Sequence, residues 1–302
     1  MSTRRVNLCL LGGLLLACAA LPTGCGDSGS AQSFPATPRT VFGGDRPVTL
    51  QVPSTYDPSR AVPLLVILHG YGASGMIQEQ YFGLAPFVES AGILIAAPDG
   101  TVDRMGRRFW NATPACCDLF HTGVDDVGYI RGLIADIRQD YNVDARRIFL
   151  IGHSNGGFMV HRMACDAAGE IAAIASLAGA TFENPDDCKP STEVSVLEIH
   201  GDADELISYT GGAIAAPYPG AVETVTHWQV YDRCEPGLVT SPMTLDLDSG
   251  LPGNETMIQG FDGCARGSDV ELWTIHGGHH VPSLTPAFAP TVWQWLQSHP
   301  KP

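Results

Sequence analysis

Runs of mostly apolar residues, each ending at glycine or a polar residue, recur along the chain. The first long run is continuous over residues 62–68 and ends at His69-Gly70. Comparable runs lie at 92–97, 147–151, 171–176, 194–199 and 270–275. A strand that is buried on both faces has such a continuous apolar sequence instead of an alternating one. The pattern therefore predicts a mostly parallel sheet whose two faces are both covered.

Segments with helical spacing separate these runs. We predict helices near residues 78–91, 125–141 and 156–168, and a last helix at 286–298. Strands that alternate with helices are typical of an α/β fold with helices on both faces of the sheet. Residues 39–42 and 47–53 predict an antiparallel hairpin that precedes the sheet. Between residues 205 and 268 the alternation of strands and helices is interrupted. We expect a loop-rich insertion there, with one helix at 222–231, rather than a second domain.

The amino terminus has the pattern of an export signal. Arg4 and Arg5 precede an apolar run at 6–21, which is shorter than the roughly 20 residues that span a bilayer. We interpret residues 1–25 as a signal peptide, with Cys25 a candidate for lipidation, 26–38 as a flexible linker and 39–302 as the catalytic domain. The alternative to a lipid anchor is cleavage of the signal peptide and secretion of the free protein. Either way we expect a secreted or envelope protein.

Composition narrows the choice of partners. The 302 residues include 17 Lys and Arg against 32 Asp and Glu, a formal net charge of −15, and 44% are hydrophobic. A chain of this size buries about three quarters of its unfolded surface, so no metal or oligomer is needed to hold the core. The negative charge argues against nucleic acid and favours a neutral substrate. Contact with a membrane is expected only through the lipid anchor.

Six of the nine cysteines lie outside the export segment. An even number in an exported chain favours disulfides, and no Cys-x-x-Cys pair indicates zinc. Cys234 and Cys264 flank one Gly- and Pro-rich excursion and are expected to close it. Cys116 and Cys117 are expected to pair outward, with Cys165 and Cys188, and not with each other. Which of them pairs with which stays open.

The apolar run at 147–151 leads into Gly152-His153-Ser154-Asn155-Gly156 and then a predicted helix. This is G-x-S-x-G between a strand and a helix, where the glycines permit a sharp turn that exposes a serine hydroxyl. We predict Ser154 as a nucleophile. A serine needs a histidine base and an acid that orients it, and both should follow later strands.

Both partners occur in the expected order. The run at 194–199 is followed by Asp202 and Asp204, and the run at 270–275 by His279 and His280. We favour Asp204 over Asp202, which is able to cap the turn instead. We favour His279 as the base, with His280 as a pocket wall. Glu205 is expected to be solvated, and the acids here lack the alternating spacing of a calcium loop, so no metal is expected.

A third strand end reads His69-Gly70-Tyr71-Gly72. A Gly-rich loop there brings backbone N–H groups close to the oxyanion of a tetrahedral intermediate. We expect the N–H groups of Tyr71 and Asn155 to form this oxyanion hole. The candidates for substrate contacts are Trp110, His153 and His280.

Taken together, these motifs resemble the secreted esterase family that includes polyhydroxybutyrate depolymerases, feruloyl esterases and acetyl-xylan esterases. The resemblance covers about residue 39 to the end and rests on the strand-end motifs above, on Cys116-Cys117, on Pro282 and on residues 124–130, Val-Asp-Asp-Val-Gly-Tyr-Ile. It implies an α/β-hydrolase fold, no cofactor, and ester hydrolysis by Ser154, Asp204 and His279. The chain departs from the usual pattern at Tyr71 and at His280-Val281-Pro282, positions that bear on the substrate.

The sequence thus predicts an exported carboxylic ester hydrolase. Its expected substrates are acyl esters of plant polysaccharides or polyhydroxyalkanoate. A serine peptidase of the same fold is the alternative among enzymes, although nothing indicates a gating domain. A surface binding protein that has lost its chemistry is the alternative outside enzymes, although none of the three triad residue types is missing.

Overall fold

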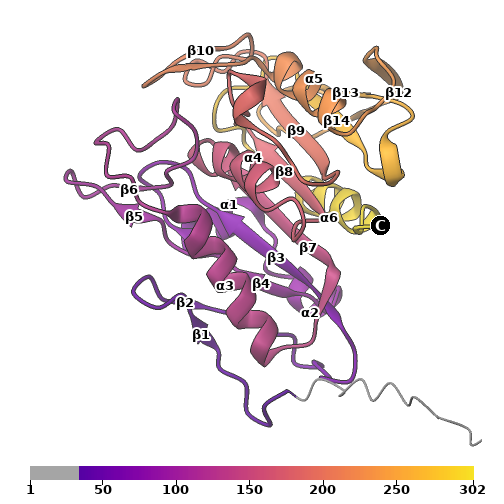
Figure 1. Cartoon of the computed structure of the whole chain (residues 1–302). Helices are drawn as coiled ribbons and strands as arrows, with labels where there is room; N and C mark the ends of the chain where they lie inside the picture. Colours follow the sequence, from indigo (N-terminus) through magenta and orange to yellow (C-terminus); the bar gives the residue numbers. More distant parts are fainter. Residues whose placement is uncertain (1–33) are drawn as a thin grey trace, which may run out of the picture. The chain divides into compact units, whose positions relative to one another are not determined.

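An eight-stranded sheet forms the centre of the structure, a computed structural model that describes residues 34–302 (Figure 1). The strand order is β12-β13-β14-β9-β8-β7-β3-β4. The six strands from β14 to β4 are parallel, while β13 and β12 are antiparallel additions at one edge. In chain order these strands are β3 (Val62–Leu68), β4 (Leu94–Ala96), β7 (Val143–His153), β8 (Ala173–Leu177), β9 (Ser195–Gly201), β12 (Val239–Leu245), β13 (Thr256–Gly260) and β14 (Val270–Ile275).

Helices cover both faces of the sheet, as the apolar runs predicted. One face packs against α3 (Asp126–Asp140), α4 (Asn155–Asp166) and α5 (Ala221–Tyr231). The other packs against α1 (Gly75–Phe82), α2 (Phe87–Ser90) and α6 (Phe288–Ser298). The expected α/β architecture is confirmed.

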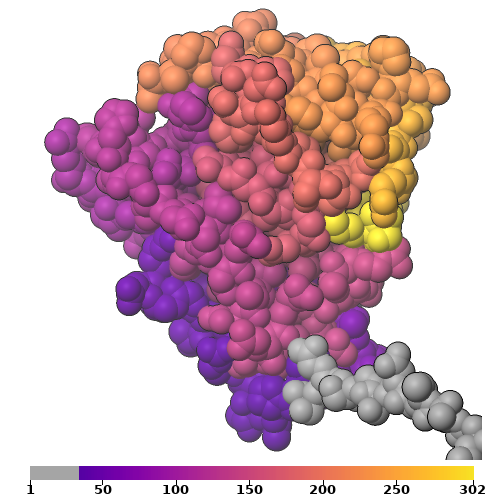
Figure 2. Space-filling view, viewed as in Figure 1, coloured from indigo at the N-terminus to yellow at the C-terminus, as the bar shows by residue number. Residues whose placement is uncertain are grey.

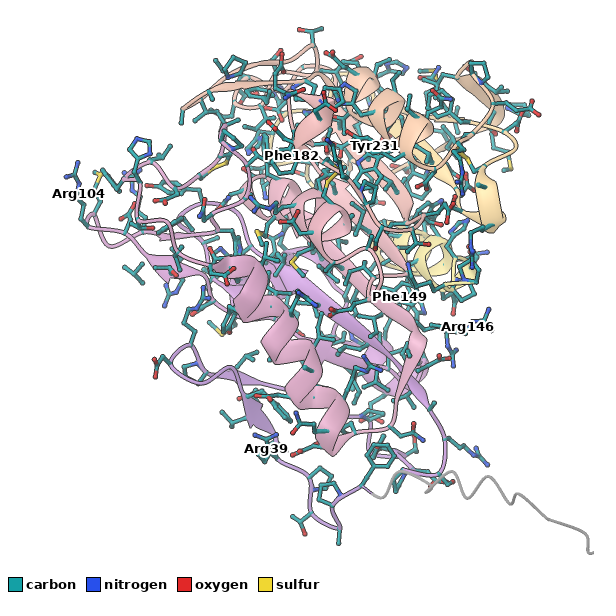
Figure 3. The ribbon with its side chains drawn as sticks, in the orientation of Figure 1. Arg39, Arg104, Arg146, Phe149, Phe182 and Tyr231 are labelled. Atoms are coloured by element: carbon teal, nitrogen blue, oxygen red, sulfur yellow. A yellow bond between two sulfur atoms is a disulfide. The ribbon has the colours of Figure 1, made fainter. Side chains whose placement is uncertain are left out.

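Alternate side chains of the central strands enter the two apolar layers. In β3, Leu64 and Val66 belong to the layer of α3 and α4, while Leu65 and Ile67 belong to the layer of α1 and α6. All four side chains are fully buried. Figure 3 shows Phe149 of β7 in this interior, while Arg39, Arg104 and Arg146 lie at the periphery. The sheet is thus a rigid platform that fixes the loops at its strand ends.

The order of the strands places a switch point at β3. The chain runs from β3 to β4 on one side and then crosses to β7 on the other side of β3. Connections that leave in opposite directions open a crevice at the carboxyl ends of the two strands, which is where α/β proteins bind ligands. Here those ends are followed by His69-Gly70-Tyr71 and by Ser154.

Three short antiparallel pairs complete the strands. They are β1 (Val41–Phe42) with β2 (Val48–Thr49), β5 (Thr101–Val102) with β6 (Arg108–Phe109), and β10 (Gly212–Ala213) with β11 (Pro217–Tyr218). The first pair is the hairpin predicted before the sheet.

Two predicted elements differ from the structure. The helix expected at 78–91 is two helices, because Gly83 ends α1 in the left-handed conformation with φ of 68°. The section expected to be loop-rich contributes β12 and β13 to the central sheet. Pro242 and the exposed side chains of β12 conceal a strand, and proline is tolerated because β12 is an edge strand. Figure 2 shows much of this later segment, in orange, along the upper edge of the visible face.

Residues 1–33 lie outside the described part of the chain. They include the predicted signal peptide, the lipidation candidate Cys25 and most of the predicted linker. Residues 34–302 form one compact unit. Within that unit, no helix combines the length and apolar character needed to cross a membrane.

Candidate active site

Ser154 occupies a strained turn between β7 and α4. Its φ and ψ are 54° and −120°, a conformation that L residues rarely adopt. The turn is so tight that a Cβ on Gly152 would lie 2.1 Å from the carbonyl oxygen of Gly156. A Cβ on Gly156 would lie 2.2 Å from the carbonyl oxygen of Leu68 at the end of β3. The glycines of G-x-S-x-G are therefore required by close backbone contacts, and the turn presents the serine side chain at the crevice.

A histidine and an aspartate complete a chain of hydrogen bonds with this serine. Ser154 Oγ lies 2.9 Å from His280 Nε2, and His280 Nδ1 lies 2.7 Å from Asp204 Oδ2. The histidine and the aspartate are 6% and 7% exposed. With Nδ1–H donated to the carboxylate, Nε2 is free to accept the serine proton. The geometry is that of an activated serine nucleophile.

The structure corrects the choice of histidine. We expected His279 as the base and His280 as a pocket wall, but His279 points to solvent and pairs with Glu205 at 3.0 Å, with 69% and 62% of the two side chains exposed. The loop turns between the two residues, so only His280 faces the nucleophile. Asp202 also lies outside the chain of hydrogen bonds, since it accepts from His276 and from the Gly277 N–H.

The carboxylate of Asp204 is held in place by four donors. Its Oδ1 accepts the backbone N–H groups of Leu206 and Ile207, each at 2.8 Å. Its Oδ2 faces His280 at 2.7 Å and His200 at 3.4 Å. Burial alone would raise the pKa of Asp204, but the hydrogen bonds from His200 and His280 outweigh burial and hold the pKa well below its ordinary value. Asp204 is therefore ionised and unable to rotate freely.

Two side chains hold the loop that carries His280. His153 Nε2 donates to the carbonyl oxygen of His280 at 2.8 Å, and the Tyr81 hydroxyl donates to the carbonyl of Pro282 at 2.8 Å. Burial, aided by the neighbouring His280, lowers the pKa of His153 to about 4. His153 is thus a neutral donor under ordinary conditions. It lines the cavity as expected, and its ring nitrogen also positions the base.

Backbone N–H groups converge beside Ser154. Asn155 is the first residue of α4, so its N–H has no carbonyl of its own helix to bond. The N–H groups on either side of Tyr71, those of Gly70 and Gly72, donate to Gln78 Oε1 and to Arg108 O. In the described part of the chain the N–H of Tyr71 has no acceptor. Tyr71 and Asn155 are therefore placed to serve as the pair of donors that the sequence predicted.

A cavity of about 580 Å³ opens directly over Ser154. Its lining is mostly apolar and includes the triad histidine, but no Asp, Glu, Lys or Arg. The lining residues are Gly70, Tyr71, Ala73, Ile77, Gln78, Tyr81, Cys116, Cys117, Leu119, His153, Ser154, Leu206, Ile207, Ile214, His280 and Val281. Such a cavity accepts a neutral, apolar group next to the nucleophile.

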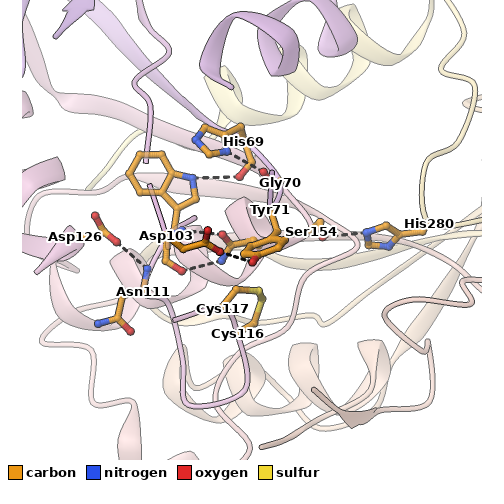
Figure 4. The surroundings of a disulfide bond; sticks show 12 residues. His69, Gly70, Tyr71, Asp103, Asn111, Cys116, Cys117, Asp126, Ser154 and His280 are labelled. Carbon is orange, nitrogen blue, oxygen red and sulfur yellow. Dashed lines mark hydrogen bonds between the residues drawn. A yellow bond between two sulfur atoms is a disulfide. The ribbon is translucent and has the colours of Figure 1, made fainter. Parts of the chain in front are cut away.

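A disulfide between adjacent cysteines forms one wall of this cavity. Cys116 is bonded to Cys117, and Figure 4 shows Tyr71, Ser154 and His280 around this bond. The expectation that these two cysteines pair outward is wrong, because Cys165, in the last turn of α4, bonds to Cys188. The predicted bond between Cys234 and Cys264 is present.

Trp110 is not a cavity residue, contrary to our expectation. It is fully buried, and its backbone N–H and C=O pair with the side-chain amide of Asn155 at 2.7 and 2.9 Å. Its indole N–H donates to the carbonyl of His69 at 3.1 Å. Trp110 thus ties the loop that carries the disulfide to the residue after the nucleophile.

Sequence reasoning missed a buried group of ionisable side chains behind the triad, formed by His161, Glu198 and His200. A signal was present, because Glu198 and His200 are two residues apart in an apolar strand and so lie on one face of it. In residues 34–302 no cluster of three or more His, Cys, Asp or Glu side chains has an arrangement that would hold a metal ion.

The parallel sheet, the serine turn at the switch point, and the order of serine, acid and histidine along the chain define an α/β-hydrolase. Residues 50–244 match the model of the phospholipase/carboxylesterase family. The chain belongs to this family, and it is a carboxylic ester hydrolase.

Curated relatives agree with this assignment. The chain is 30% identical to feruloyl esterase B of Piromyces equi over 245 residues, which are 78% of this chain and 42% of that protein. It is 32% identical to the putative esterase NocK of Nocardia uniformis subsp. tsuyamanensis over 242 residues, 76% of this chain and 68% of that protein. The chain therefore spans less than half of the first relative and about two thirds of the second.

Among solved structures, an acetyl xylan esterase from Aspergillus awamori superimposes with a TM-score of 0.60 at 15% identity. The match covers 86% of this chain and 98% of that one. At this level of identity the likeness concerns the fold alone.

Proposed function

We propose that the protein cleaves esters through an acyl-enzyme formed on Ser154. The hydroxyl attacks the ester carbonyl while His280 Nε2 accepts its proton, and the imidazolium then gives this proton to the leaving alcohol. Asp204 orients the imidazole and stabilises its charge. Water, activated by the same histidine, releases the acyl group and regenerates the serine.

The tetrahedral oxyanion is stabilised by the N–H groups of Tyr71 and Asn155. The second donor lies at the N-terminus of α4, a helix of 12 residues whose dipole also favours negative charge there. Loss of one such donor from an oxyanion hole typically costs about 10²- to 10³-fold in kcat.

We propose a bulky aromatic acyl group, of the hydroxycinnamoyl class found on plant polysaccharides, as the substrate. The observation that carries this proposal is the uncharged cavity of about 580 Å³ over the nucleophile, far larger than an acetyl group needs. Tyr71, Tyr81 and the apolar wall formed by Cys116 and Cys117 suit a planar ring. Feruloyl esterase B, a relative at 30% identity, is named for such a substrate.

One polar donor that borders this cavity has no partner among residues 34–302. Gln78 is 3% exposed, its Oε1 accepts the N–H of Gly70, and among the described residues its Nε2 has no acceptor. A buried donor without a partner costs about 1–3 kcal/mol, and because this nitrogen is closed off from solvent, an oxygen of the substrate would satisfy it only once the Gln78 side chain turns toward the cavity. The phenolic or methoxy oxygen of a hydroxycinnamoyl ring is an acceptor of this kind.

A panel of esters with purified protein tests the proposal. We expect kcat/KM to be higher for methyl ferulate than for an aryl acetate or for soluble hydroxybutyrate oligomers. Ser154→Ala should abolish turnover of all three, and a sulfonyl fluoride should label Ser154 in the wild type. Turnover by Ser154→Ala would refute the proposed mechanism, whereas a preference for acetate would refute only the proposed acyl group.

Polyhydroxyalkanoate is a second candidate, favoured by the rim of the cavity. Five lining residues are large, apolar and exposed, and such a rim suits contact with an apolar polymer surface. They are Ile77, Leu119, Leu206, Ile214 and Val281. This candidate predicts that the protein releases soluble products from a polymer film. Replacing Leu206 and Val281 with serine should abolish that release while soluble esters are still cleaved.

Export is part of the proposal and rests on the sequence pattern at the amino terminus. We propose that residues 1–25 direct the chain out of the cytoplasm and that Cys25 carries a lipid. Fractionation of expressing cells, with Cys25→Ser as the matched variant, tests the anchor. Release of the variant and retention of the wild type in the membrane fraction are the expected results.

A further inference from the structure

A chain of buried side chains, joined by hydrogen bonds and one ion pair, extends from the triad along β9 to the helices α4 and α5. It begins at Asp204, passes through His200 and Glu198 of β9, and continues to His161 of α4 and Trp228 of α5. His161 and Glu198 are fully buried, and His200 is 1% exposed. None of these three is needed to attack an ester, so their burial calls for another reason.

The partners along this chain fix the protons on His161. Trp228 Nε1–H donates to His161 Nδ1 at 3.0 Å, and indole nitrogen is a donor only. Nδ1 is therefore unprotonated. His161 Nε2 then donates to Glu198 Oε2 at 2.9 Å, so His161 is a neutral imidazole.

His200 is in a different state, because both of its nitrogens face oxygen acceptors. Nδ1 lies 3.1 Å from Glu198 Oε1, and Nε2 lies 2.8 Å from the carbonyl oxygen of Ile207. A carboxylate and a backbone carbonyl accept and do not donate, so both nitrogens carry protons. The same Nε2 lies 3.4 Å from Asp204 Oδ2. With Glu198 and Asp204 ionised, this geometry makes His200 a buried imidazolium between two carboxylates.

The electrostatic surroundings agree with this geometry. Burial would lower the pKa of His200, but hydrogen bonds with Asp204 and Glu198 outweigh burial and raise it to about 9. Burial would raise the pKa of Glu198, but its hydrogen bonds with His161 and His200 hold it below the ordinary value. The other titratable groups facing His200 are Tyr209, whose ring meets the imidazole edge-on at 5.7 Å, and the neutral His153 of β7.

We propose that His200 is a positioning residue whose permanent positive charge, held by Glu198, fixes Asp204 and offsets part of its negative charge. The proposal rests on the triad proposed above. A cation beside Asp204 weakens the attraction that the carboxylate exerts on a proton at His280 Nε2. Removing that cation should therefore change the pH dependence of ester cleavage, and this dependence is what the test measures.

The test compares His200→Gln with His161→Gln. Both residues are buried histidines bonded to Glu198, so the two substitutions disturb the core alike, but only the first removes a charge beside Asp204. We expect the acid limb of the kcat/KM profile for a soluble aryl ester to move up by about half to one pH unit in His200→Gln, and to stay in place in His161→Gln. A purely structural role would lower the active fraction without moving the limb.

An unmoved limb in a folded His200→Gln protein, or equal movement in both variants, would overturn the proposal. If His200→Gln does not fold, NMR of the histidine ring nitrogens at pH 8, on protein that keeps His200, decides whether this residue is an imidazolium. His299 also pairs with an acid, Asp269, so the spectra are recorded on His299→Gln. One histidine with both nitrogens protonated supports the proposal, and none overturns it. Loss of activity in Ser154→Ala with an unmoved limb in His200→Gln would reject this inference alone and leave the triad intact.

Discussion

Replacing His280 with alanine, next to the same replacement at His279, separates two neighbours that the sequence treats alike. His280 bridges Ser154 and Asp204 with contacts of 2.9 and 2.7 Å. Removing it takes away the base and leaves the carboxylate without its main partner. We expect kcat/KM for an aryl ester to fall by roughly 10⁴-fold, to the residual rate that the oxyanion hole and binding provide.

His279→Ala has a different expected outcome. Its pair with Glu205 is exposed on both sides, and ion pairs between exposed side chains contribute little because water and salt screen them. We expect kcat/KM to stay within about threefold of the wild-type value, because the hydrogen bond of His279 goes to Glu205 and not to the reacting groups.

The assay is initial-rate hydrolysis of a soluble aryl ester at several concentrations, with thermal unfolding of both variants to show that each is folded. Titration of active sites with a sulfonyl fluoride gives the reactive fraction of the wild type and of His279→Ala, whereas His280→Ala, which lacks the base, is expected to react very slowly. A larger loss from His279→Ala than from His280→Ala, with both proteins folded, would refute the placement of the loop that follows β14.

The remaining predictions concern the acid, a disulfide and a buried carboxyl. Asp204→Asn should lower kcat by roughly 10³- to 10⁴-fold by favouring the wrong imidazole tautomer, while Asp202→Asn should change it little; reversed kinetics would contradict the assignment. Replacing Cys234 and Cys264 with serine should lower the free energy of unfolding by about 3 kcal/mol, since they close a loop of 30 residues, and denaturant titration measures this. Burial raises the pKa of Asp232 to about 7, so folding favours its protonated form, and this contribution is lost as pH rises from about 4 through 7. Asp232→Asn should therefore unfold at a higher temperature than the wild type at pH 8 and at a similar temperature at pH 4; equal melting at both values would contradict the shift.

The nucleophile was predictable because its evidence is local. A buried strand, two glycines and a helix all lie within a few residues of Ser154, and the contact that requires glycine at position 152 lies within the same turn. The central strands were predictable for a similar reason, because a strand buried on both faces leaves a continuous apolar run.

The base was not predictable, because long-range contacts select it. His279 and His280 follow the same Gly-Gly pair, and the choice depends on His153 and Tyr81, which hold the loop from positions 127 and 201 residues away. The pairing of Cys116 with Cys117 and the burial of Trp110 likewise depend on how one loop folds back on α4. The sequence contains these residues but not their neighbours.

The contact between Gly156 and the end of β3 has a consequence for how this enzyme can diverge. Main chain meets main chain there, so the separation of the two proposed oxyanion donors is set by the backbone and not by any side chain. The side chain of Tyr71, in contrast, extends into the cavity and hydrogen bonds Asp103. Exchange of that side chain can therefore retune which acyl group is accepted while the machinery for bond cleavage keeps its dimensions. In this proposal a single residue separates the two traits, because the N–H of Tyr71 contributes to the rate and its phenol ring contributes to selectivity.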